Sequence, residues 1–138
     1  MPVIEELIRT EEDGSISFGN YKLAQKAKKS DFEHQGDLYK VKTCREITKL
    51  ERNDMFVYES VPGTAAEHFK VFDEGVEFFV EGDQDAQITV QMENDSEYEV
   101  YVNDAAVGSM KTNMSGKLSV SVELEDGNAV KVSAVRRA

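Results

Sequence analysis

The sequence predicts an all-β protein, built as an antiparallel β-sandwich. In the C-terminal half, apolar and polar residues alternate, as from Leu118 to Leu124, where every second side chain is apolar. A period of two is typical of a strand with one buried face. Turn-forming residues separate about six such runs, and antiparallel sandwiches show this pattern. No segment between the runs is long and helical enough to connect parallel strands.

The first thirty residues are less regular, and here the prediction allows a minor helical content. Residues 1–13 fit either a short helix or an edge strand, because Val3, Ile4, Leu7 and Ile8 follow a helical spacing. Residues 15–19 alternate and predict a strand after the Asp-Gly turn at 13–14. Residues 21–30 are rich in Lys and Ala, which favours a helix.

The remaining elements are predicted to be strands joined by turns. Residues 38–44 alternate, and the Asn-Asp pair at 53–54 separates two β-prone runs, as in a hairpin. Val-Pro-Gly-Thr at 61–64 and Asp-Glu-Gly at 73–75 are further turn signals. The expected strands are 15–19, 38–44, 46–50, 55–59, 69–71, 76–80, 87–92, 98–102, 105–110, 118–124 and 130–134.

The composition disfavours several partners. The chain of 138 residues has 27 acidic and 16 basic side chains, a net charge of -11. Such acidity disfavours nucleic acid and anionic membranes, whose binding depends on Lys and Arg. No apolar run approaches the ~20 residues of a membrane span, and the first residues lack the pattern of a signal peptide. We therefore expect a cytoplasmic protein with no membrane partner.

The inventory of reactive side chains is thin. Cys44, His34 and His68 are the only cysteine and histidines, and they show neither the spacing of a zinc site nor a nucleophile motif. A thiol–imidazole pair is the alternative to a structural cysteine, and the β-prone surroundings of Cys44 favour the structural role. Acidic turns at strand ends admit calcium, but turn formation explains them without a metal. We predict no catalytic residue, no metal site and no cofactor.

Two groups of residues are candidate binding surfaces. Phe79, Tyr101 and Val135 fall on the expected polar face of their strands, so they predict a second packing surface. The N-terminal half is its simplest partner, and another chain or a second copy is the alternative. Lys22, Lys26, Lys28 and Lys29 form a basic cluster, which is either a solvated face or an anion-binding patch.

Three segments carry a resemblance to a known family. In Gly-Ser-Ile-Ser-Phe-Gly-Asn-Tyr at 14–21, in residues 30–43 and in residues 56–65, the chain resembles a bacterial family of short β-rich proteins that carry an endosialidase or "endosialidase catalytic beta chain" label. The resemblance implies a carbohydrate-active protein with a glycan partner. Residues 98–108 and 116–122 are similar to immunoglobulin-like β-sandwich modules, which implies that fold for the C-terminal half.

Together these patterns predict an N-terminal β-rich lobe at 1–74 and a C-terminal immunoglobulin-like sandwich lobe at 75–138, packed together as one body. The predicted function is a non-enzymatic binding or assembly module, with a protein partner or a second copy of the chain. The alternative is the carbohydrate-active protein that the resemblance implies.

Overall fold

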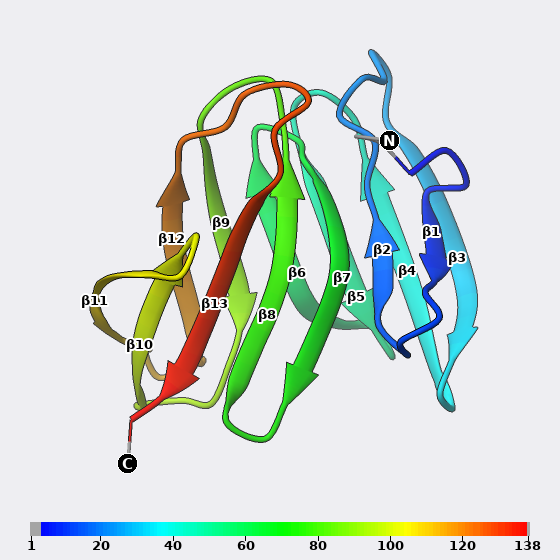
Figure 1. The fold of residues 1–138 in the computed structure, drawn as a ribbon. Helices are drawn as coiled ribbons and strands as arrows, with labels where there is room; N and C mark the ends of the chain where they lie inside the picture. Colours follow the sequence, from blue (N-terminus) through cyan, green and yellow to red (C-terminus); the bar gives the residue numbers. More distant parts are fainter. Residues whose placement is uncertain (1–3, 138) are drawn as a thin grey trace.

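Two antiparallel sheets pack face to face in the computed structural model, which describes residues 4–137 (Figure 1). The described residues form 13 strands and no helix, so the prediction of an all-β sandwich is confirmed. The strands are β1 (Ile8–Thr10), β2 (Ile16–Phe18), β3 (Ala27–His34), β4 (Asp37–Thr43), β5 (Thr48–Arg52), β6 (Met55–Val61), β7 (Ala65–Phe72), β8 (Gly75–Glu81), β9 (Ala86–Gln91), β10 (Glu97–Val102), β11 (Ala105–Lys111), β12 (Lys117–Val122) and β13 (Val130–Arg136).

Both sheets draw strands from both halves of the chain. The seven-stranded sheet has the order β1-β2-β7-β8-β13-β10-β11, and the six-stranded sheet has the order β12-β9-β6-β5-β4-β3. The predicted boundary between residues 74 and 75 falls in the turn of the β7–β8 hairpin, whose strands pair within one sheet. One cluster of buried side chains runs from Ile8 to Ala134. The division into an N-terminal lobe at 1–74 and a C-terminal lobe at 75–138, packed together as one body, stays a prediction.

Short turns with left-handed residues join several of the hairpins. Asn53 and Asp54 have φ of 50° and 65°, and Asn103 and Asp104 have φ of 52° and 67°. Asn and Asp tolerate this region, and two consecutive residues with positive φ suit the twist of a two-residue hairpin loop. Gln35 and Gly36 connect β3 to β4 in the same way. These loops fix the register that places the side chains described below.

Aromatic rings fill the core between the sheets. Phe18 contacts Tyr58 and Phe69 edge to face, with ring centroids 5.0 Å and 5.5 Å apart. The Tyr58 ring also packs on Phe78, and its hydroxyl lies 2.7 Å from Thr64 Oγ1. Complete burial raises the pKa of Tyr58 to about 12. The polar end of this core ring is therefore hydrogen-bonded and neutral.

The helix expected at residues 21–30 is wrong. Residues 21–26 form a turn followed by an irregular segment, and β3 begins at Ala27. This strand pairs with β4, with Ala27 opposite Thr43 and His34 opposite Asp37. Helix propensity is a weak preference, and here the pairing of β3 along β4 overrides it. For residues 1–13, the edge-strand alternative holds at Ile8–Thr10, while Val3 lies outside the described residues.

The two lateral sides of the sandwich differ. On one side β1 and β3, the edge strands of the two sheets, lie close together (Figure 1). His34 on β3 joins them, because its Nδ1 lies 3.1 Å from Thr10 Oγ1 and its Nε2 3.0 Å from the Gly14 carbonyl. On the other side β11 pairs only with β10, and β12 only with β9. We call these the closed side and the open side.

Candidate functional site

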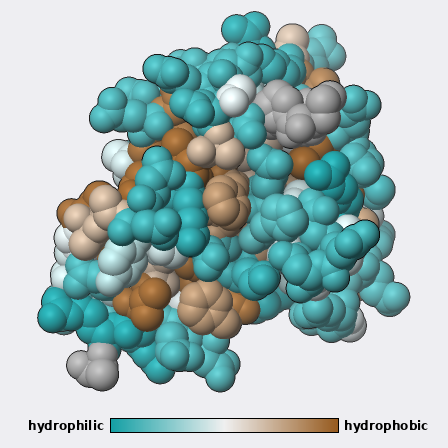
Figure 2. Space-filling view, viewed as in Figure 1, coloured by the Kyte–Doolittle hydropathy of each residue, from teal (hydrophilic) through white to brown (hydrophobic). Residues whose placement is uncertain are grey.

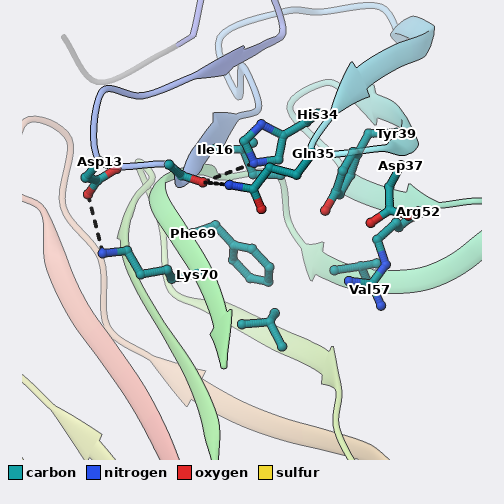
Figure 3. Close-up of a pocket in the computed structure, with 12 residues that line it drawn as sticks. Asp13, Ile16, His34, Gln35, Asp37, Tyr39, Arg52, Val57, Phe69 and Lys70 are labelled. Carbon is teal, nitrogen blue, oxygen red and sulfur yellow. Dashed lines mark hydrogen bonds and ion pairs between the residues drawn. The ribbon is translucent and has the colours of Figure 1, made fainter. Parts of the chain in front are cut away.

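A hollow of about 310 Å³ lies between the sheets next to the closed side (Figure 3). Its apolar base consists of inner-face side chains, Ile16 and Phe69 from the seven-stranded sheet and Val57 from the six-stranded sheet. Its polar lining includes Asp13, His34, Gln35, Asp37, Tyr39, Arg52 and Lys70. A volume near the lower limit for ligand pockets suits a small molecule.

Strand register brings the polar groups of the hollow together. Tyr39 on β4 is directly opposite Arg52 on β5, so both side chains project from the same face of the six-stranded sheet. His34 on β3 is likewise opposite Asp37 on β4. The hairpin loops at 35–36 and 53–54 therefore gather an imidazole, a carboxylate, a phenol and a guanidinium at one end of the sheet.

Hydrogen bonds fix the wall that the seven-stranded sheet contributes. The Asp13 carboxylate accepts hydrogen bonds from the Ser15 hydroxyl and the Ser15 N–H, and lies 3.6 Å from Lys70 Nζ. These bonds, with those of His68 and the charge of Lys70, hold the pKa of Asp13 well below its usual range. Gln35 Nε2 donates to the Gly14 carbonyl at 3.3 Å. The loop at 11–15 is thus a preorganised wall.

Ser15, His68 and Asp13 are residue types of a hydrolase triad, but their geometry is different. Ser15 Oγ and Asp13 Oδ2 both approach the same ring atom, His68 Nδ1, at 3.3 Å and 3.2 Å. A triad needs the acid on one ring nitrogen and the nucleophile on the other. The Ser15 hydroxyl also donates directly to Asp13. The cluster is therefore a structural clamp on the β1–β2 turn.

Three groups in the hollow have unused bonding capacity. Tyr39 as a residue is only 9% exposed, and its hydroxyl, which keeps some contact with solvent, forms no hydrogen bond with any described residue. Arg52 forms no ion pair within the described chain. Asp37 Oδ1 accepts a hydrogen bond from Asn53 Nδ2 at 2.9 Å, and its carboxylate has no basic partner among residues 4–137. Sequence reasoning missed this site, although the hairpin at 38–52 contained the register that assembles it.

The predicted surface residues Phe79, Tyr101 and Val135 lie on neighbouring strands of the seven-stranded sheet. Phe79 is 38% and Val135 37% exposed, and Tyr101 is half-buried. They lie in different cross-strand rows, where Phe79 is opposite Lys131 and Tyr101 opposite Ser133. Figure 2 shows apolar surface scattered between hydrophilic side chains on this face. Their role in binding a partner stays a prediction.

The predicted lysine patch is dispersed. Lys22 Nζ lies 2.8 Å from Asp126 Oδ2, and Lys29 Nζ lies 5.6 Å from the centre of the Phe32 ring. Lys28 is instead directly opposite Lys42, which is opposite Lys49 on the next strand. The basic surface is therefore a row across β3, β4 and β5, while Lys26 lies in the turn before β3.

The open side presents a second candidate site along β11. Every residue from Ala105 to Ser109 is exposed, Val107 by 52%, and Met110 is half-buried. A side chain at Gly108 would meet nothing within 4 Å. No charged residue lies between 105 and 110. The closed-side edge strand β3, by contrast, carries two lysines, Asp31 and Glu33. We call residues 105–111 the open edge.

Two further sets of reactive side chains are Cys44 and the carboxyl pair of Glu67 and Glu81. Cys44 is buried and forms no disulfide, and its N–H donates to the Ile47 carbonyl. Burial raises the pKa of Glu67, and the charge of Glu81 and a hydrogen bond with it add to this effect. Within residues 4–137, no group of three or more His, Cys, Asp or Glu side chains has the arrangement of a metal site.

Comparison with protein-family models, with curated proteins and with solved structures finds no match. The resemblance to endosialidase-labelled proteins and to immunoglobulin-like modules therefore stays a prediction. Among the described residues, the structure has no helix of the length and hydropathy needed to cross a membrane.

Proposed function

We propose that this chain is a non-enzymatic binding or assembly module that adds a β-strand of another chain to its open edge. The observation that carries the proposal is the exposure of β11 over residues 105–109 without a charged side chain. An unprotected edge strand presents free backbone N–H and C=O groups, which another strand can use to extend the sheet. The seven-stranded sheet would then continue into the partner.

A second copy of the chain is the occupant that charge favours. Asp104, which also lies 3.1 Å from Lys131 Nζ of its own chain, directly precedes the open edge, Lys111 ends it, and both residues are exposed. Antiparallel pairing of two copies of β11 places each Lys111 beside the Asp104 of the other copy. Pairing of opposite charges fixes the register, and the uncharged stretch between them avoids repulsion at the centre of the interface.

Sedimentation velocity over a concentration series tests the proposal. The wild-type protein should form dimers, and Val107→Lys should remain a monomer, because a lysine on an edge strand blocks strand pairing. Val61→Lys is the matched control: Val61 is 55% exposed but lies on β6, which is paired on both sides. Both variants reduce the net negative charge equally. A wild-type monomer, or dimers that persist in Val107→Lys, would refute the proposal.

The carbohydrate-active alternative stays a prediction from the resemblance. It is tested by binding to a glycan array and by hydrolysis of a sialoside.

A further inference from the structure

The hollow beside the closed side is not needed by an edge-pairing module. It lies between the sheets at β1–β2–β7 and β3–β5, whereas the open edge belongs to the opposite lateral side. Its polar lining contains a solvent-accessible phenol hydroxyl without a hydrogen bond, the exposed Arg52 and the half-buried Asp37, and neither charged group has an ion-pair partner among the described residues. Solvent reaches these groups, and a ligand with complementary polar groups can take the place of that solvent.

From these groups we infer that the hollow binds a small zwitterion, an α-amino acid with an apolar side chain. The Arg52 guanidinium and the Tyr39 hydroxyl are donors that suit a carboxylate, and they project from the same face because they are register partners. Asp37, whose Oδ1 is anchored by Asn53, supplies an acceptor for an ammonium group. Ile16, Val57 and Phe69 form an apolar base for the side chain of the ligand.

The charge of the hollow favours a zwitterion over a simple anion. Arg52 and Lys70 supply two positive charges, and Asp13 and Asp37 supply two negative charges. Asp13 and Lys70 form an ion pair with each other, at 3.6 Å. Arg52 and Asp37 form no such pair, although both line the same space (Figure 3). A ligand with one charge of each sign satisfies both, whereas an anion leaves Asp37 unsatisfied and close to a like charge.

The walls are rigid enough to hold such a ligand without rearrangement. Both ring nitrogens of His34 are hydrogen-bonded, and the His34 ring packs edge to face on Tyr39 with centroids 5.9 Å apart. Phe69 is fixed by its contacts with Phe18 and Phe78. These fixed walls reduce the entropy lost on binding, whereas the exposed Arg52 side chain must be ordered by the ligand.

The test is a titration of the ¹⁵N-labelled protein with L-leucine, followed by the amide resonances of β4 and β5 and by the Arg52 Nε–H resonance. L-Leucine should shift these resonances in a saturable way. N-Acetyl-L-leucine lacks the ammonium group and L-leucinamide lacks the carboxylate, so each should bind at least about tenfold more weakly, which is the value of one lost charged hydrogen bond.

Variants separate the roles of the two donors. Tyr39→Phe removes only the hydroxyl and should weaken L-leucine binding by about tenfold with an unchanged melting temperature. Arg52→Gln should abolish binding. Lys49→Gln is the control, since it removes a cation from the outer face of the same strand, and it should bind as the wild type does. The inference is overturned if L-leucine causes no saturable shift, if N-acetyl-L-leucine binds equally well, or if Tyr39→Phe and Lys49→Gln have the same affinity.

Discussion

The edge strands on the closed side and on the open side of the sandwich differ in length, charge and coverage. On the closed side β1 has three residues, β3 carries several charges, and His34 links the two edges through Thr10 and Gly14. On the open side β11 has seven residues, of which only Lys111 is charged. Short, charged or covered edges resist unintended pairing. The difference indicates that one side stabilises the fold while the other remains available to a partner.

The largest change in the free energy of unfolding is expected for a substitution in the core next to the closed side. Phe18→Ala removes a fully buried ring that contacts Tyr58 and Phe69, so it should lower the free energy of unfolding by about 3–5 kcal/mol. Val107→Ala on the open edge should change it by no more than about 0.5 kcal/mol. Urea denaturation measures both. Similar losses for the two variants would mean that β11 is as buried as β2, contrary to the comparison.

The link across the closed side should have the next largest effect. His34→Ala removes both hydrogen bonds of the ring and should cost about 1–3 kcal/mol. Gln87→Ala is the control, because Gln87 on β9 is exposed and its side chain forms no hydrogen bond with the described residues. If amide hydrogen exchange at β1 and β2 is faster in His34→Ala and unchanged in the control, the loss of stability is local to the closed side. Equal effects of the two substitutions would argue against a specific role of His34.

Acid should remove the stabilisation that Asp13 gives to the β1–β2 turn. The pKa of Asp13 is lowered by its hydrogen bonds to Ser15 and His68 and by Lys70, so the ionised carboxylate stabilises the fold above the unfolded value of 3.8. This contribution is lost as the pH falls through the lower folded pKa. Asp13→Asn should therefore be less stable than the wild type at neutral pH and should lose less stability on acidification.

Melting temperatures between neutral and strongly acidic pH check this prediction. Asp95→Asn is the control, since the Asp95 side chain lies in the β9–β10 turn and forms no hydrogen bond with described residues. If the acid limb of Asp13→Asn has the same slope as that of the wild type, the clamp at the β1–β2 turn does not stabilise the fold.

The smallest change in the free energy of unfolding is expected for substitutions on the outer face of the six-stranded sheet. Lys42 lies between Lys28 and Lys49, and like charges directly opposite each other destabilise a sheet. Lys42→Gln should raise the free energy of unfolding by about 0.2–1 kcal/mol, less at high salt. Lys40→Gln should have the opposite sign, because Lys40 is opposite Glu51. The same sign for both would exclude cross-strand charge as the cause.

The alternation in the sequence predicted most strands, and the reason is that one face of each is buried. On β12, the core-facing side chains are those of Leu118, Val120 and Val122, as their spacing indicates. The same reasoning failed at 27–34, where Lys and Ala favoured a helix and only the pairing with β4 determines the strand. Local patterns contain no information on which distant strand supplies a partner.

The hollow could not be predicted from the sequence, because its lining residues are distant from one another along the chain. Tyr39 and Arg52 are thirteen positions apart, and only the β4–β5 register places them side by side. Asp13, in the β1–β2 turn, and Lys70, on β7, belong to the other sheet, so their approach to Tyr39 and Arg52 depends on the packing of the whole sandwich. The open edge is different: the uncharged stretch 105–110 is visible in the sequence, but its place at the margin of the sheet is not.

The most direct test of the open edge as a partner surface is amide hydrogen exchange, measured residue by residue in dilute and in concentrated protein. If two copies pair through β11, the amides of residues 105–111 should gain protection as the concentration rises, while those of β1 and β3 should not change. Protection that is independent of concentration at β11, or that rises instead at β3, would contradict the account.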